Sequence, residues 1–248
     1  EFDITIIEQS QDGRMFNRGA LLNTAYHLTM NEDGNPKYDS YIFHDVDLLP
    51  TDGTDGTPDM IPAYAGPYQR GDIAHIASEW DRYKNPGKYL GGVTLFGSYV
   101  FRLINGFPNN YWGWGGEDDE LLRRRERQTN LIDCPAPPVD PIKLVGKQNG
   151  LVDLEEISII KDKKDILKSQ GNINPVRYEG KDQHNETWES NGLKQFNIDD
   201  SSKTIFHIEN SETIDVQTTT RDLSINIKTL TVVLNYNQMK PFEKDTSL

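Results

Sequence analysis

The chain has 248 residues, a mass of 28.3 kDa, 35% hydrophobic residues and a formal net charge of −13. This excess of carboxylates argues against a nucleic-acid partner, because proteins bind phosphate backbones mainly through lysine and arginine. No run of about 18 apolar residues occurs, so we expect no membrane contact within this chain. Cys134 is the single cysteine, which excludes an internal disulfide and a cysteine-based zinc site. Composition leaves the oligomeric state open.

Strand-like and helix-like segments alternate in the first half of the chain. Residues 2–8 (FDITIIE) are rich in β-branched side chains, 17–30 (NRGALLNTAYHLTM) have apolar residues at helical spacing, and 39–50 (DSYIFHDVDLLP) resemble a buried strand ending in acids. Strand, helix and strand in this order predict a parallel-sheet unit. Residues 87–106 then predict a strand, a turn and a short helix, and 117–128 predict a helix with acids in its first turn.

The residue pattern of the chain changes beyond a proline-rich connector at 134–141 (CPAPPVDP). Residues 201–235 contain segments of alternating polarity, which predict antiparallel strands. We therefore expect an α/β fold with two parts. Residues 1–200 would form the core domain, and residues 201–248 would form an accessory β-rich extension packed on it.

Asp45 and Asp47 follow the apolar segment that ends at His44. Alternation along a strand would point both carboxylates to the same side. The carboxyl end of a strand in an open α/β sheet is where ligands bind, and hard oxygen ligands there suit Mn²⁺ or Mg²⁺. The competing interpretation is a helix cap or a solvated strand end, because an Asp-x-Asp triplet is common.

Four motifs together carry a family resemblance. They are FNRGALLN at 16–23, HDVDLLP at 44–50, KYLGGV at 88–93 and INGFPNNYWGWGGEDDE at 104–120. In order and approximate spacing the chain resembles the β-1,4-galactosyltransferase family. The first two motifs and the ending EDDE of the last are most similar to the branch that adds galactose to xylose, and NGFPNNYWGWGGEDD at 105–119 is also similar to the branch that uses N-acetylglucosamine. The resemblance is strong up to residue 130 and thins beyond it.

This resemblance implies a GT-A-type fold, an α/β sheet flanked by helices. It also implies transfer of galactose from UDP-galactose to a hydroxyl of an acceptor sugar of the xylose or N-acetylglucosamine type, with inversion and with Mn²⁺ or Mg²⁺ as cofactor. A tyrosine at position 89 is similar to enzymes that prefer galactose over its N-acetylated analogue, although Tyr89 could simply pack on its neighbours. The resemblance assigns donor binding to Phe16, Arg18, Asp45, Tyr89, Gly91 and Trp114.

An inverting transfer needs a base beside the acceptor hydroxyl, opposite the departing diphosphate. Asp118 is the candidate base. Glu117 and Asp119 would hold other acceptor hydroxyls, together with Trp114 and Gly92. Carboxylates this close together should raise the pKa of at least one of them.

The tryptophans and glycines before these acids resemble the mobile lid of the family, which excludes water when the donor binds. Trp112 and Trp114 offer flat faces for a sugar ring, and core packing is the alternative for each. Asp119 and Glu120 equally suit a helix N-terminus. Residues 123–125, three arginines, are expected on a solvated helical face.

The chain departs from the family at the metal site. Asp47 would bind the metal, but the position of the family histidine holds Ile159. Glu156 is our candidate for the second ligand. Glu155 and a remote histidine such as His184 or His207 are the alternatives.

A second departure lies at the start of the chain. The family places a uridine-contacting strand upstream of the segment that matches residues 2–8, and this chain begins too late to contain it. Two alternatives therefore accompany galactosyl transfer: a silent module of the same fold that binds saccharide or nucleotide, and a transferase using another UDP-sugar. The resemblance implies the Golgi lumen, whereas the single cysteine would also suit the cytoplasm.

Overall fold

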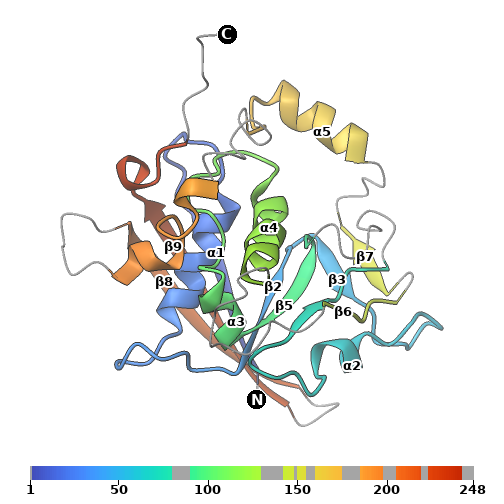
Figure 1. Ribbon diagram of the computed structural model, residues 1–248. Coiled ribbons are helices and arrows are strands. Elements are labelled where there is room, and N and C mark those ends of the chain that lie inside the picture. Colours follow the sequence, from blue (N-terminus) through green and yellow to red (C-terminus); the bar gives the residue numbers. More distant parts are fainter. Residues whose placement is uncertain are drawn as a thin grey trace.

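The computed structural model is built from sheets of mixed topology with helices packed around them (Figure 1). It describes residues 2–79, 90–129, 142–147, 150–154, 160–174, 185–197, 205–218 and 223–241. The predicted α/β fold class is confirmed. No helix in these ranges is long and apolar enough to cross a membrane.

The four-stranded sheet contains β2 (Ser40–His44), β5 (Val93–Gly97), β4 (Ile73–His75) and β6 (Lys143–Leu144) in that order. Strand β5 is antiparallel to both β2 and β4, and β6 is parallel to β4. All five residues of β5 are buried, including the polar Thr94. Helix α3 (Ser98–Leu103) follows β5 directly, so the expected strand and short helix are confirmed, but no turn separates them.

A three-stranded sheet joins the two ends of the chain. Strand β1 (Phe2–Gln9) is parallel to β9 (Leu223–Leu234), and β9 forms an antiparallel hairpin with β8 (Phe206–Thr218). Helix α1 (Arg18–Leu28) lies against this sheet. Their shared core contains Ala20, Leu21, Trp112, Ile205, Leu230, Val232, Leu234 and Met239.

The predicted parallel unit of residues 2–50 is wrong, because β1 and β2 belong to different sheets. All eight residues of β1 pair with β9, whereas β2 pairs antiparallel with β5. The predicted antiparallel character of the C-terminal segment is confirmed by β8 and β9. Their hairpin shares a sheet with β1, while the boundary between 1–200 and 201–248 stays a prediction.

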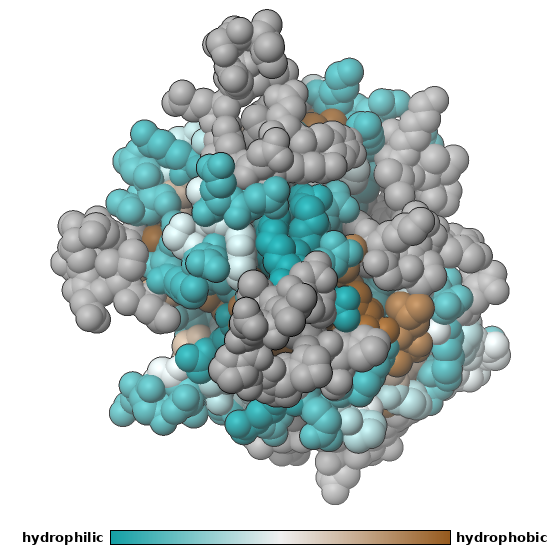
Figure 2. Space-filling view, viewed as in Figure 1, coloured by the Kyte–Doolittle hydropathy of each residue, from teal (hydrophilic) through white to brown (hydrophobic). Residues whose placement is uncertain are grey.

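The other described elements lie outside these two sheets. They are β3 (Leu48–Pro50), β7 (Leu151–Asp153), α2 (Ile61–Tyr64), α4 (Glu117–Thr129), α5 (Ile160–Ser169) and 3-10 turns at Leu193–Asn197 and Tyr236–Gln238. Strands β3 and β7 pair antiparallel. Figure 1 shows α4 near the middle and α5 at the periphery. The face of the molecule in this view is mainly hydrophilic, with apolar side chains gathered on one side (Figure 2); Leu49 and Val152 are exposed on β3 and β7.

Candidate active site

Asp45 and Asp47 lie in the turn between β2 and β3 rather than in a strand. The expected strand alternation is therefore wrong, and Val46 between them is 83% exposed. The turn is nevertheless at the carboxyl end of β2, as predicted. The amide of Asp45 donates to the carbonyl of Gly92 at 3.0 Å, which brings the glycine motif next to the aspartates.

Gly91 and Gly92 are both buried beside this turn. Gly92 has φ +75°, a left-handed conformation that glycine adopts without strain. Nε2 of His75 lies 3.0 Å from the carbonyl oxygen of Gly91, and burial lowers the pKa of His75, so a neutral ring holds this backbone. Tyr89 lies outside the described residues.

Arg18 joins the two acidic motifs of the chain. It is the first residue of α1, whose N-cap Asn17 accepts a hydrogen bond from Ala20. Its Nε and Nη2 atoms lie 2.8 and 2.7 Å from Oδ1 of Asp45, and its Nη1 lies 3.7 Å from Oε1 of Glu117. One guanidinium therefore links the turn after β2 to the start of α4.

The charges around Arg18 shift the protonation of their neighbours. Burial, and then the negative charge of Asp118, raise the pKa of Glu117 to about 8, although Arg18 opposes this shift. Burial alone would lower the pKa of Arg18, but Asp45, Glu117 and Asp118 outweigh burial and raise it. The expectation that one clustered carboxyl has a raised pKa agrees with Glu117.

The acidic run forms the first turn of α4. Glu117, Asp118, Asp119 and Glu120 all lie in that turn, where carboxylates interact favourably with the helix dipole. The Asp118 side chain accepts a hydrogen bond from the amide of Asp119 at 2.8 Å. Glu117 and Asp118 are buried, while Asp119 is half-buried. The geometry therefore satisfies the helix-start alternative for Asp119 and Glu120, and acceptor binding by Asp119 stays a prediction.

The two tryptophans before α4 differ in their surroundings. Trp112 is 1% exposed, and its indole Nε1 donates to the carbonyl of Met239 at 2.7 Å. The core alternative is therefore correct for Trp112, which offers no open face to a sugar. Trp114 is half-buried and forms a backbone bridge with the segment after α5: its amide donates to Asn172 and its carbonyl accepts from Asn174.

The glycines around Trp114 adopt conformations that other residues rarely reach. Gly113, Gly115 and Gly116 have φ of +85°, +105° and +98°. A Cβ atom on Gly113 would lie 2.8 Å from the amide nitrogen of Asn174. The amide of Gly113 also donates to the carbonyl of Phe16 at 2.7 Å, which places the half-exposed Phe16 beside the predicted lid.

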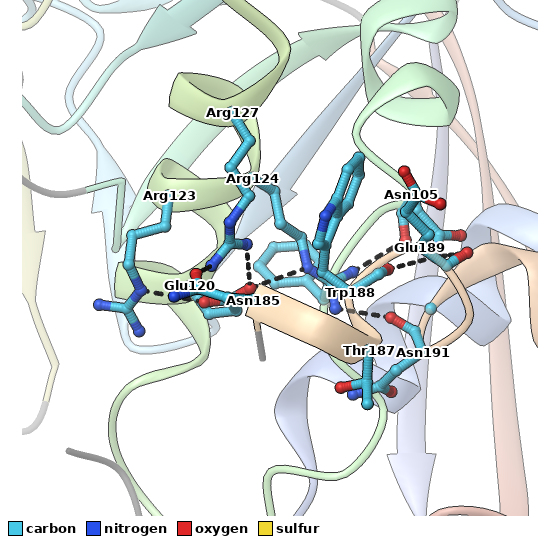
Figure 3. Close-up of polar contacts among 12 residues, drawn as sticks. Asn105, Glu120, Arg123, Arg124, Arg127, Asn185, Thr187, Trp188, Glu189 and Asn191 are labelled. Atoms are coloured by element: carbon cyan, nitrogen blue, oxygen red, sulfur yellow. Dashed lines mark hydrogen bonds and ion pairs between the residues drawn. The ribbon is translucent and has the colours of Figure 1, made fainter. Parts of the chain in front are cut away.

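Further along α4, the structure contradicts the expected solvated arginine face. Arg124 is fully buried, and its guanidinium donates to the carbonyls of Asn105, Gly106 and Asn191 at 2.6 to 3.1 Å (Figure 3). It also contacts Glu120, whose carboxylate is paired with further arginines on α4. The four-residue spacing of Glu120 and Arg124 was the available signal, but an exposed ion pair has the same spacing.

The described residues do not by themselves fit a divalent metal ion. The carboxylate of Asp45 is paired with Arg18, and Oδ2 of Asp47 lies 3.2 Å from Nζ of Lys163. No group of three or more His, Cys, Asp or Glu side chains is arranged for a metal among the described residues. Glu156, the predicted second ligand, lies outside them.

The other metal-site candidates gain no support from the structure. Glu155, Ile159 and His184 lie outside the described residues. His207 is an exposed residue of β8, in the sheet that contains β1. Metal binding by Asp47 and Glu156 stays a prediction.

Comparison with known families supports the motif resemblance. Residues 1–56 match the family model described as the N-terminal region of glycosyl transferase group 7, and residues 71–139 match the model described as the N-terminal domain of galactosyltransferase. Human beta-1,4-galactosyltransferase 4 is 37% identical over 145 residues, and human beta-1,4-galactosyltransferase 2 is 41% identical over 171 residues. These alignments cover 58% and 66% of this chain, which spans 39% and 42% of the lengths of those proteins.

A solved structure supports the fold. The Drosophila beta-1,4-galactosyltransferase 7 mutant in complex with manganese, UDP-Gal and xylobiose has a TM-score of 0.56 at 20% sequence identity. The match covers 96% of this chain and 83% of that chain. A likeness at this identity shows the shared GT-A-type architecture.

Proposed function

The chain belongs to the β-1,4-galactosyltransferase family, and from that premise we propose that it transfers galactose from UDP-galactose to a hydroxyl of an acceptor sugar. The observation that carries this proposal is the position of the Arg18 guanidinium, which forms an ion pair with Asp45 and contacts the carboxyl group of Glu117. It brings the predicted donor motif and the predicted acceptor motif to one place. This proximity supports a single site for donor and acceptor.

In the proposed step, Asp118 accepts the proton of the acceptor hydroxyl. The acceptor oxygen forms a bond to the anomeric carbon while the bond from that carbon to the UDP oxygen breaks, which inverts the configuration. The electron pair leaves with UDP, and the positive charge of Arg18 stabilises the departing diphosphate. Glu117, with its raised pKa, can donate a hydrogen bond to a neighbouring sugar hydroxyl.

The surroundings of Trp114 and its neighbouring glycines support the proposal that this segment is a lid. The indole belongs to a half-buried residue on a segment rich in positive φ, next to Phe16 on the donor side and Glu117 on the acceptor side. Such a segment can cover the sugars and exclude water that would hydrolyse the donor. Gly91 and Gly92 allow the backbone to approach the sugars from the side of Asp45.

The relatives support the proposed substrate class. The Drosophila protein binds UDP-Gal and xylobiose in its structure, which supports UDP-galactose as donor and a xylose-type acceptor, with N-acetylglucosamine as the alternative. Its manganese supports a divalent cation in the family, Mn²⁺ or Mg²⁺, which would supply charge to the diphosphate. We further propose the Golgi lumen as the compartment, with saccharide or glycoconjugate acceptors as partners.

The ion pair between Lys163 and Asp47 favours one alternative function. A basic side chain on a predicted metal ligand would also suit a silent member of the fold that binds nucleotide or saccharide without transfer. Such a protein would bind UDP but would release none from UDP-galactose.

The test is UDP release from UDP-galactose, with Mn²⁺ present and with xylose or N-acetylglucosamine as acceptor. We expect acceptor-dependent release that falls at least about a hundredfold in Asp118→Asn, the usual loss when a general base is removed. Glu126→Gln is the matched control, because Glu126 is an exposed carboxylate on the same helix. Equal release by Asp118→Asn would remove Asp118 as the base, and binding without any release would favour the silent module.

A further inference from the structure

Lys163 is a basic residue of α5 whose side chain turns back toward the candidate site. Its Nζ lies 3.2 Å from Oδ2 of Asp47, and the two side chains are 21% and 13% exposed. The neighbouring Asp162, Lys164 and Asp165 on the same helix are exposed. Lys163 therefore differs from these three exposed neighbours in its contact with the turn after β2.

The burial of this pair argues against an incidental surface contact. An exposed ion pair contributes little, whereas a mostly buried ammonium is costly unless it is held by an opposite charge. The partners are 116 positions apart in the sequence, so the fold itself brings them together. Arg18 pairs with Asp45 in the same turn. Each aspartate of the Asp-x-Asp motif therefore has its own basic partner.

This arrangement has a direct consequence for an anionic donor. A nucleoside diphosphate needs positive charge both to bind beside carboxylates and to depart from the sugar. An ammonium on a flexible four-carbon stem can move from a carboxylate to a phosphate oxygen without movement of its helix. Arg18 adds a planar donor group suited to phosphate geometry.

We propose that Lys163 is a donor-binding residue, whose ammonium moves from Asp47 to the diphosphate and, with Arg18, holds the nucleotide at the turn of residues 45–47 without a divalent ion. This inference rests on the proposed function, because it concerns the nucleotide of the same donor. It explains why Asp47 has a basic partner in the described structure. It also gives the donor a source of charge that does not depend on Glu156.

The experiment is calorimetry of UDP binding to the full chain in excess EDTA. We expect the wild type to bind, and Lys163→Met to bind about tenfold or more weakly, the size of a lost hydrogen bond to a charged group. Lys164→Met, an exposed lysine on the same helix, is the matched control and should bind as the wild type does. Lys163→Arg should recover most of the affinity, because it keeps the positive charge.

Asp47→Asn separates direct contact from a structural role. If the ammonium binds the diphosphate, removal of the competing carboxylate should leave UDP binding in EDTA equal to or tighter than that of the wild type. A loss in Asp47→Asn as large as in Lys163→Met would show that the pair only supports the turn, and would overturn the proposal.

Two other outcomes would also overturn it: equal affinities of wild type and Lys163→Met, or binding by the wild type only after Mn²⁺ is added. Both would leave galactosyl transfer standing, because UDP still binds. Absence of UDP binding with and without Mn²⁺ would contradict the proposed function itself. Circular dichroism of each variant checks that the fold is kept, and Lys163→Gln replaces Lys163→Met if the latter fails to fold.

Discussion

Two charge clusters on α4 use buried charges in opposite ways. In the arginine cluster, Arg123, Arg124 and Arg127 all contact the carboxylate of Glu120, so positive charge is in excess. In the acidic cluster, formed by Glu117 and Asp118, negative charge is in excess, and the pKa of Glu117 is raised. Compensated charges of the first kind fix the helix in place, whereas carboxylates under mutual repulsion can act on a proton or a hydroxyl. The difference separates the structural cluster of the helix from the functional one.

The largest effect should come from breaking the arginine cluster around Glu120. Arg124→Met should lower the free energy of unfolding by about 3–5 kcal/mol, because it leaves the buried carbonyls of Asn105, Gly106 and Asn191 without their donor. Urea unfolding measures this change. Arg70→Met is the control: Arg70 forms an exposed ion pair with Asp39, which should be worth less than about 1 kcal/mol. Equal losses in the two variants would refute the structural role of Arg124.

The next effect concerns the glycine-rich segment that precedes the acidic cluster at Glu117 and Asp118. Gly34→Ala, at φ +73° with open space around it, should cost about 1–2 kcal/mol from backbone conformation alone. Gly113→Ala should cost more, because its Cβ would also lie too close to the amide of Asn174. Thermal unfolding of both variants compares the costs. If Gly113→Ala were the milder change, the packing of this segment against residues 172–174 would be wrong.

The pH dependence of stability tests the excess of negative charge in the acidic cluster at Glu117 and Asp118. The folded pKa of Glu117, about 8, exceeds its ordinary value of 4.5, so the folded state binds more protons than the unfolded state between these values. The stabilisation from protonated Glu117 is complete below about pH 4.5 and is lost as the pH rises through about 8. Denaturation of wild type and Glu117→Gln across this range should show a steeper decline in the wild type. Parallel curves would mean that Glu117 titrates normally.

The smallest effect should come from Arg123, a partly exposed member of the arginine cluster. Arg123 is partly exposed and shares Glu120 with two other arginines. Arg123→Ala should therefore lower the free energy of unfolding by less than about 1 kcal/mol. Urea unfolding beside Arg124→Met gives the comparison directly. A loss as large as that of Arg124→Met would mean that burial does not separate these arginines.

Local patterns in the sequence predicted local structure well. The apolar run before Ser98 became β5, and the acids at 117–120 became the first turn of α4. The family motifs predicted that Arg18, Asp45 and Glu117 serve one site, and the structure brings these three together. Such features depend on residues close in sequence or on a motif that is long and unusual.

Long-range pairing could not be predicted in this way. The partner of β1 is β9, more than 200 residues later, and no local pattern identifies it. The solvated face predicted for Arg124 was wrong and Trp112 was ambiguous for a similar reason, since their burial depends on Asn191 and Met239 from distant segments. The flanking glycines did indicate that Trp114 has different surroundings from Trp112. A Cβ atom on Gly113 would lie too close to the amide of Asn174, so a glycine there lets the backbone of Trp114 approach residues 172–174.

The most direct test of the central claim is the anomeric configuration of the product. UDP-galactose and xylose would be incubated with the wild type and with Asp118→Asn, and the disaccharide would be examined by proton NMR. We expect a β-linked galactoside from the wild type and a product signal reduced at least about a hundredfold in the variant. An α-linked product, or equal product from Asp118→Asn, would contradict it.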